Sequence, residues 1–325
     1  MLSDATDHLW KRPSAPDDAV TRALAGVARI EARPAPTSNG PFRASGLGKL
    51  CPRGAVLQAA GAVLGEVHTR RDARDVWALA VGTAYHAAWQ DALLPLLPGA
   101  TLLGWWARDI ALSGGQGGEG VHPWGTVIMS HHVEVARGDK QAGALPYAAI
   151  PRPPGEGWRY VELGFADAQD NLTGHCDGVL AWADGTREVL ELKTASPRSF
   201  TQVDGAYGGV PYPEHLVQVQ LYMAWAGLQR ARIVYVRKEA DAAIDAIAEH
   251  VVAYDHAVVA EVRDVVRDAR AALAGFECWQ AYGGSMPMPV PDRLLGCKFK
   301  GDKRARRCDQ RDACFAKDVA RACGK

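Results

Sequence analysis

The segment from Gly174 to Lys193 constrains the fold of this 325-residue chain more than any other. Residues 173–182 predict a strand, residues 183–185 (Ala-Asp-Gly) predict a turn, and the residues up to Lys193 predict a second strand. Successive side chains of a strand point to opposite faces, so Glu191 and Lys193 emerge on the same side. We therefore expect a β-hairpin with an acid and a base on one face.

The register of this hairpin decides which residues face one another. A two-residue turn would pair Asp177 with Leu192, which turns the acid to the wrong face. A three-residue loop with Gly185 in the left-handed conformation pairs Asp177 with Glu191 instead. We favour the second register because it gathers the two acids beside the lysine, with His175 nearby on the same face.

Two carboxylates beside an ammonium group would be costly without a purpose, because like charges repel. A divalent cation resolves the conflict, since the hard oxygens of Asp177 and Glu191 suit Mg²⁺ or Mn²⁺. Such an ion would polarise a phosphoryl oxygen and lower the pKa of a bound water, which Lys193 would orient or activate. The alternative is a ladder of salt bridges on an exposed sheet face. Glu162, on the predicted strand Tyr160–Ala166, could reach a second metal ion or pair with a base.

Two predicted helices carry further candidates. His86 follows Gly82 by one turn inside a helical pattern that runs from about Ala73 to Leu97. Another helix opens at His215, and Gln218 and Tyr222 on it are four residues apart, so they share a face. Taken singly, each of these residues is typical of ordinary packing or of the edge of a core.

Together, these four motifs resemble the RecB-like branch of the PD-(D/E)XK nucleases, over about Leu47 to Cys314. The order is a Gly-x-x-x-His helix, a Gly-x-x-Asp strand, a Glu-x-Lys strand and a Gln-x-x-x-Tyr helix. The resemblance implies that the histidine, the two acids and a backbone carbonyl bind metal. It also implies a catalytic lysine, with the glutamine and tyrosine lining the active site and the DNA path. Carried over, these residues are His86, Asp177, Glu191, the carbonyl of Leu192, Lys193, Gln218 and Tyr222.

The cysteines indicate a second metal site. Their number is odd and no secretory segment stands at the N-terminus, which argues against a disulfide framework. Four of the seven crowd the end of the chain, so zinc or an iron–sulfur cluster is expected. The seven are Cys51, Cys176, Cys278, Cys297, Cys308, Cys314 and Cys323.

The chain also resembles nucleases of this branch that hold a 4Fe–4S cluster, namely AddB-type subunits and CRISPR-associated exonucleases. That resemblance implies one cysteine before the nuclease core and three after it, here Cys51, Cys297, Cys308 and Cys314. In these nucleases two residues usually separate the second ligand from the third (Cys-x2-Cys), whereas ten residues separate Cys297 from Cys308. Cys323 is the substitute for Cys297. We expect Cys176 and Cys278 to be buried apolar fillers rather than ligands.

Composition gives no global sign of a nucleic-acid partner, because Lys+Arg and Asp+Glu both total 37. No apolar run is long enough to span a bilayer, so we expect a cytoplasmic protein without a membrane partner. The last 29 residues, from Cys297 to Lys325, hold ten basic and four acidic side chains. The run from Lys298 to Arg307 could bind the DNA backbone, or it could be a solvated loop.

The expected fold class is α/β, a central mixed sheet flanked by helices, like restriction endonucleases, with a cluster-bound lobe made from both chain ends. Residues 1–45 predict an irregular arm with a short helix near Ala19–Ala32. Residues 46–110 predict a helical region, residues 111–285 the nuclease core, and residues 286–325 a cysteine-rich basic segment. Within the core we expect a single strand over Val127–Ala136 and an amphipathic helix over His256–Ala274.

The expected function is metal-dependent hydrolysis of DNA as an exonuclease acting on ends or single strands. Recombination, repair or CRISPR-type processing would supply separate protein partners, since the chain has no nucleotide-binding P-loop. The alternatives are a non-catalytic nucleic-acid-binding or scaffold protein, and an interaction protein stabilised by zinc at its cysteine-rich tail.

Overall fold

The computed structural model describes residues 29–32, 36–63, 68–71, 73–109, 118–122, 125–129, 133–238, 246–283, 287–292, 297 and 314–315. Several predicted features lie outside the described residues. They are residues 1–28 of the predicted arm, the basic run from Lys298 to Arg307, Cys308 and Cys323.

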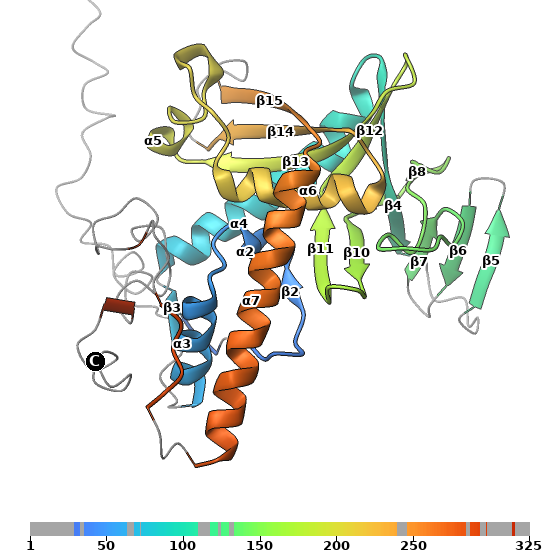
Figure 1. Ribbon diagram of the computed structural model, residues 1–325. Coiled ribbons are helices and arrows are strands. Elements are labelled where there is room, and N and C mark those ends of the chain that lie inside the picture. Colours follow the sequence, from blue (N-terminus) through green and yellow to red (C-terminus); the bar gives the residue numbers. More distant parts are fainter. Residues whose placement is uncertain are drawn as a thin grey trace, which may run out of the picture.

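A mixed sheet forms the centre of the fold (Figure 1). Only β13 and β14 of this sheet pair in parallel within the described residues, and the other pairs are antiparallel. In spatial order the strands are β15 (Ile247–Ala253), β14 (Arg230–Arg237), β13 (Arg187–Ala195), β12 (Gly178–Trp182), β4 (Ala100–Asp109), β7 (Val133–Arg137), β6 (Gly125–Met129) and β5 (Gly118–His122). Two short strands, β8 (Ile150–Pro151) and β9 (Arg159–Val161), also pair with β4. The predicted α/β class with a central mixed sheet is confirmed.

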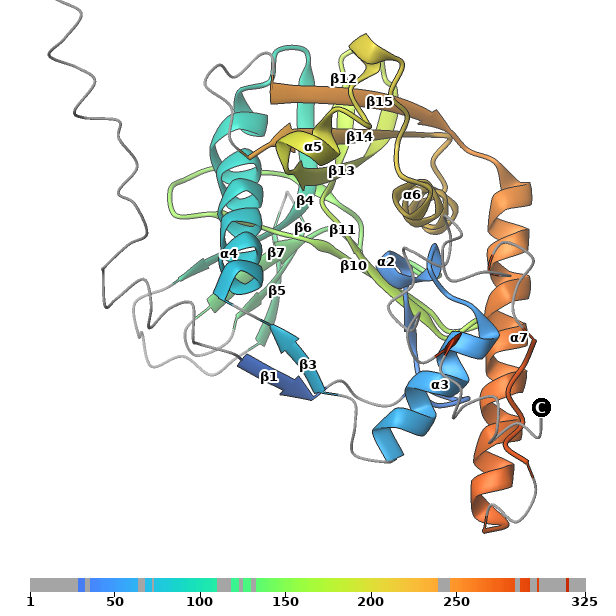
Figure 2. The same ribbon diagram turned by 90° about the vertical axis from the view of Figure 1, so that its left-hand side faces the viewer.

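Helices cover both faces of this sheet around β13 (Figure 2). On one face α4 (Ala73–Ala88) continues into η1 (Trp89–Leu93) and η2 (Leu94–Leu96), and it packs over Leu190 and Leu192. On the other face α6 (Pro213–Ala226) packs over Val189. Because apolar residues of β13 are buried on both sides, Glu191 and Lys193 point into the interior of the molecule rather than to an open sheet face.

A smaller sheet stands beside the first one and consists of β10 (Leu163–Asp167), β11 (Leu172–Cys176) and β2 (Phe42–Arg43). Strand β2 is followed in the sequence by α2 (Ala44–Leu47) and α3 (Pro52–Val63). Helix α3 packs along the long helix α7 (His256–Ala281). The remaining elements are β1 (Arg29–Ala32), which pairs with β3 (His68–Arg71), and the short helices α5 (Pro197–Phe200) and η3 (Gly205–Tyr207).

The predicted hairpin register is confirmed. Gly178 pairs with Leu190, and the N–H of Trp182 donates to the carbonyl of Thr186 at 2.8 Å. Gly185 has a φ of 85°, the left-handed conformation that a three-residue loop requires. One feature of the hairpin differs from the prediction, since residues 173–182 do not form a single strand. The strand breaks at Asp177, where the chain passes from the small sheet, described above, into the large one.

Other predicted elements were wrong where both faces of a strand are buried or where a turn carries no signal. The predicted helical region contains strand β4, whose apolar run over residues 102–106 is buried on both faces and therefore lacks the alternation of a half-exposed strand. The predicted single strand Val127–Ala136 is an antiparallel hairpin, and residues 130–132 between its arms contain no glycine or proline. Residues 29–32 of the predicted arm helix form β1. The predicted helix from His256 is confirmed and runs on to Ala281.

None of the helices in the described part of the chain combines the length and the apolar character needed to cross a membrane.

Candidate active site

A cavity of about 250 Å³ opens where the two sheets meet. The large sheet contributes β13, the small sheet contributes the edge of β11, and α4 and α6 close the cavity from two sides. It is lined by Arg43, Ser45, His86, Glu162, Thr173, Gly174, His175, Asp177, Glu191, Lys193, Gln218 and Tyr222. The side chains of the predicted acids, lysine, histidine, glutamine and tyrosine are therefore brought together at one place.

Asp177 is buried, with 4% of its surface exposed, and is held by several polar contacts. Its Oδ2 accepts the N–H of Leu192 at 2.7 Å, and its backbone carbonyl accepts Nε2 of Gln90 at 3.0 Å. Its Oδ1 lies 3.1 Å from Nδ1 of His86, and this contact raises the pKa of His86 although burial opposes the shift. The strand break thus aims a fixed carboxylate at the helix that carries the histidine.

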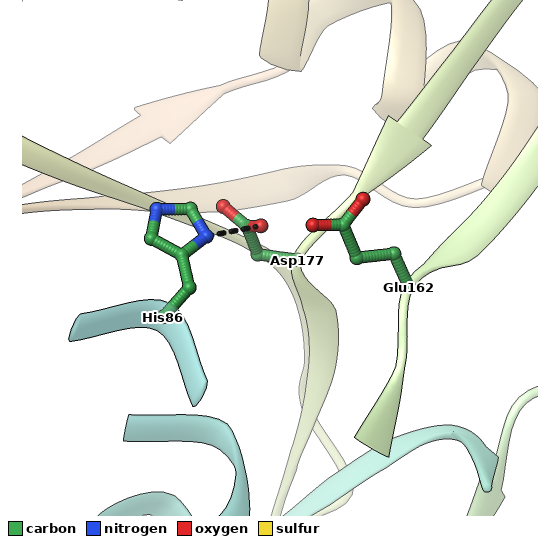
Figure 3. Close-up of side chains that lie close together, drawn as sticks. All are labelled: His86, Glu162 and Asp177. Atoms are coloured by element: carbon green, nitrogen blue, oxygen red, sulfur yellow. Dashed lines mark ion pairs between the residues drawn. The ribbon is translucent and has the colours of Figure 1, made fainter. Parts of the chain in front are cut away.

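Glu162 reaches the same point from the neighbouring strand pair. Leu163 pairs with Cys176 across the hairpin of β10 and β11, so Glu162 and Asp177 stand opposite each other where both strands break. One ligand atom each from His86, Glu162 and Asp177 lies within 4.8 Å of the others (Figure 3). Burial, followed by the charge of Asp177, raises the pKa of Glu162. In the sequence, the only indication that Glu162 belongs to the site is its position on the predicted strand just before the hairpin of Asp177 and Glu191.

Glu191 and Lys193 form an ion pair on β13. Glu191 is 2% exposed, and its Oε2 is buried without a hydrogen-bond partner in the described part of the chain. Burial, joined by the charge of Asp177, raises the pKa of Glu191 to about 8 although Lys193 opposes the shift. A buried carboxylate oxygen without a donor is costly, and a cation bound nearby would remove that cost.

Gln218 and Tyr222 face the cavity from α6, as their spacing predicts. Nε2 of Gln218 donates to the Tyr222 hydroxyl at 2.9 Å, and the Tyr222 ring stacks on Phe165 with a centroid separation of 5.6 Å. Burial raises the pKa of Tyr222, so its hydroxyl remains protonated. Both side chains therefore form a fixed polar wall.

The side chain of Leu192 packs in the core, while its backbone faces the site. Its N–H donates to Asp177, and the N–H and C=O of one residue in a strand point to the same side. Sequence reasoning missed Arg43, Ser45 and Thr173. The first and last of these pair across β2 and β11, a contact between distant segments that no local motif signals.

The described cysteines differ in burial. Cys176 is fully buried, as predicted. Cys278, which was also predicted to be buried, is exposed, because Phe276 lies on the buried stripe of α7 and a residue two positions further on points away from that stripe. Cys51, Cys297 and Cys314 are half-buried. Arg53 joins the two ends of the chain, since its Nε donates to Sγ of Cys314 at 3.2 Å and its Nη1 to the carbonyl of Pro291 at 2.8 Å.

The donor set around Asp177 fits a divalent cation. Carboxylate oxygens predominate, one imidazole nitrogen joins them, and the unpartnered oxygen of Glu191 adds a further acceptor. Mg²⁺ and Mn²⁺ prefer such oxygen-rich sites.

Comparison with known proteins adds a family. A family model described as "PD-(D/E)XK nuclease superfamily" matches residues 49–315. No curated protein matches the chain. Among solved structures, an alkaline exonuclease (LHK-Exo) from Laribacter hongkongensis is 16% identical with a TM-score of 0.40, covering 76% of this chain and 95% of its own. LHK-Exo in complex with dAMP is 17% identical with a TM-score of 0.39 and the same coverage. The structure of SSO0001 is 16% identical with a TM-score of 0.33, covering 78% of this chain and 88% of its own.

Proposed function

Because the chain belongs to the PD-(D/E)XK nuclease superfamily, we propose that it hydrolyses phosphodiester bonds of DNA with the help of Mg²⁺ or Mn²⁺. One observation carries this proposal. The ligand atoms of His86, Glu162 and Asp177 lie within 4.8 Å of one another, beside a buried Glu191 oxygen that lacks a hydrogen-bond donor among the described residues.

His86, Glu162, Asp177, Glu191 and the carbonyl of Leu192 would hold the metal ion. When bound, the ion supplies positive charge that polarises a phosphoryl oxygen and acidifies a water molecule. Asp177 needs little reorganisation to serve, because the N–H of Leu192 already fixes its carboxylate.

Lys193 is the residue that we propose orients or activates the attacking water. Its ammonium group lies beside Glu191 at the cavity, where it can hold a water molecule or a phosphate oxygen in place. Gln218 and Tyr222 would bind the substrate from the opposite wall, and their mutual hydrogen bond fixes the amide and the hydroxyl. The site thus combines a place for a cation with a positioned amine.

We further propose that the substrate is a DNA end or a single strand, and that the enzyme acts as an exonuclease in recombination, repair or CRISPR-type processing with separate partner proteins. The proposal rests on the resemblance of the four motifs to RecB-like nucleases. The presence of all three charged residues, Asp177, Glu191 and Lys193, at one cavity favours catalysis over a scaffold that merely binds nucleic acid.

Hydrolysis of end-labelled single- and double-stranded DNA with Mn²⁺ tests the proposal. Asp177→Ala and Lys193→Ala should each lower the rate by about a hundredfold or more. Asp184→Ala serves as the matched control, since Asp184 is an exposed acid in the loop of the same hairpin. Full activity of both site variants would refute the assignment.

For the cysteines we propose a 4Fe–4S cluster held by Cys51, Cys297, Cys308 and Cys314, with zinc as the alternative metal. Its support is the Cys-Pro-Arg segment at Cys51, which resembles the iron–sulfur nucleases, and the contact of Arg53 with Cys314. Iron, sulfide and zinc contents of anaerobically purified protein distinguish the two metals.

A further inference from the structure

Aromatic and cationic side chains gather where β4, β7 and the loop between β7 and β8 meet. The guanidinium carbon of Arg137 lies 3.5 Å from the ring centroid of Tyr147 and 5.8 Å from that of Trp105. The two rings meet edge to face at 6.2 Å. Lys140 pairs with Tyr147 through a short antiparallel bridge, and its ammonium nitrogen lies 6.0 Å from the same ring. Trp105 is buried and supports the half-buried Arg137 and Tyr147, while Lys140 is exposed. We call these four residues the stacking surface.

The stacking surface adjoins the cavity through the hairpin of β10 and β11. A Cβ added at Gly164 would lie 3.6 Å from Cζ3 of Trp105 and 3.6 Å from Nε2 of His175, so the glycine leaves space between the two rings. His175 is exposed and lines the cavity. The N–H of Ala166 on β10 also donates to the carbonyl of Ala144 at 2.7 Å, which ties the loop of Tyr147 to the hairpin.

Arg137 lacks the counter-charge that a comparable arginine has. Arg108 stacks on Trp158 with its guanidinium carbon 4.6 Å from the ring centroid, and it forms an ion pair with the buried Glu134. Arg137 is half-buried and has no carboxylate partner among the described residues.

An arginine stacked on aromatic rings without a carboxylate suits an anion from outside the molecule. Unpaired nucleotides offer both a phosphate for the cation and a flat base for stacking, whereas the bases of a duplex are stacked on one another. Given the proposed nuclease function, on which this inference rests, we propose that the stacking surface binds the unpaired strand of the substrate next to the cavity. His175 would lie between this surface and the metal site.

Fluorescence anisotropy with a labelled single-stranded oligonucleotide tests the inference, in an Asp177→Asn background that prevents cleavage. Arg137→Gln and Tyr147→Leu should each weaken binding about tenfold. Arg137→Gln should also reduce the slope of log affinity against log salt by about 1. Arg108→Gln is the matched control and should bind like the parent, because Arg108 is a stacked arginine that is already paired. A blunt hairpin duplex should lose much less affinity than the single strand.

Far-UV circular dichroism establishes that each variant is folded. If Arg137→Gln does not fold, Arg137→Lys replaces it and should keep the salt slope while losing affinity, since a lysine keeps the charge without the planar stack. Single-strand binding within twofold of the parent for the folded Arg137 and Tyr147 variants, or equal losses for single strand and duplex, would overturn the inference. Because the assay measures binding without cleavage, its outcome is independent of whether the chain proves to be a nuclease.

Discussion

Glu162 shows how a single residue can complete a metal site from outside the expected motif. It stands opposite Asp177 at a second strand break, and together with His86 these side chains place three ligand atoms within 4.8 Å of one another. Each carboxylate ligand strengthens the binding of a hard cation. We therefore expect Glu162→Gln to lower Mn²⁺ affinity about tenfold in a calorimetric titration. Glu156→Gln, which changes an exposed acid nearby in sequence, should leave the affinity unchanged, and unchanged affinity in Glu162→Gln would exclude this ligand.

The Gly-x-x-Asp motif that leads to Asp177 begins with Gly174, and the packing around this residue leaves no room for a side chain. A Cβ at this position would lie 2.7 Å from Cε1 of Tyr222 and 3.1 Å from the Cβ of Ala44. Gly174→Ala should therefore push the tyrosine away from Gln218 and destabilise the fold by about 1–3 kcal/mol, the usual cost of overpacking. Urea unfolding and nuclease assays measure both effects.

Gly164→Ala is the matched control for this change, because Gly164 lies on the adjacent strand and its added Cβ would meet no atom closer than 3.6 Å. Equal losses of stability in the two variants would show that the tyrosine contact is not the reason for the glycine at position 174.

His215 links the stability of the fold to pH. The N–H of Tyr212 donates to the hydroxyl of Tyr235, which can in turn donate to Nδ1 of a neutral His215 at 2.8 Å. Burial, and then the charges of Lys193 and Lys49, lower the pKa of His215 from 6.5 to about 3. Between these two values the unfolded chain binds a proton that the folded chain does not, so the free energy of unfolding falls as the pH falls.

At pH 5 this histidine should lower the free energy of unfolding by about 2 kcal/mol relative to neutral pH. His215→Gln, which can still accept the hydrogen bond, should lose less stability than the parent between pH 7 and pH 5 in thermal unfolding experiments. His256→Gln changes an exposed histidine and should leave the pH dependence as it is in the parent. Identical curves for parent and His215→Gln would contradict the assignment.

At the scale of elements, α7 supports the small sheet through a polar stripe. Arg263, Arg270 and Glu277 follow one another at intervals of seven residues, so they lie along one side of the helix. Arg263 pairs with acids of the turn between β10 and β11, and Glu277 accepts the N–H and hydroxyl of Ser38. The apolar stripe of α7 predicts only that the helix packs against the core. The polar stripe determines the position of the β10–β11 hairpin and of the segment before β2 relative to the helix.

Arg270 is the centre of the stripe. Its two Nη atoms donate to four backbone carbonyls at 2.6–3.0 Å, those of Ser38, Gly40, Asp170 and Asn171. Arg270→Met removes these four hydrogen bonds, although the Asn171 carbonyl keeps the N–H of Phe42 as a donor, and should lower the free energy of unfolding by about 3 kcal/mol in urea. Arg267→Met on the same helix is the control, because Arg267 is exposed and pairs only with Asp264 among the described residues. A loss no larger than in the control would show that water replaces the arginine.

The elements that could be predicted from the sequence are those fixed by local chemistry. Gly185 determines the loop, the loop determines the register, and the register brings Asp177 level with Glu191. The strand breaks at Glu162 and Asp177 could not be predicted. At each break the chain leaves one sheet and enters the other, so β9 and β12 belong to the large sheet while β10 and β11 belong to the small one. Likewise Arg43 reaches the cavity through pairing between segments far apart in the chain, for which a single sequence has no signal.

At the scale of the whole molecule, contacts between the two ends of the chain surround the proposed thiolate site. Arg53, 9% exposed, follows Cys51 at the start of α3, and its guanidinium group reaches both Cys314 and the carbonyl of Pro291. The N–H of Gly54 donates to Sγ of Cys51 at 3.2 Å, so both sulfur atoms receive a hydrogen bond from one turn of the helix. Donors of this kind stabilise thiolates and the metals they hold.

A metal that joins Cys51 to Cys314 would close a loop containing almost the entire nuclease core, which restricts the unfolded chain more than a short loop does. Cys51→Ser and Cys314→Ser should each lose the bound iron or zinc and lower the thermal midpoint by about 5 °C or more. Cys278→Ser should keep both metal and midpoint, because Cys278 is exposed on α7. Undiminished metal content in Cys51→Ser would show that the N-terminal cysteine is not a ligand. The start of α3 would then be joined to Cys314 by Arg53 rather than by the metal.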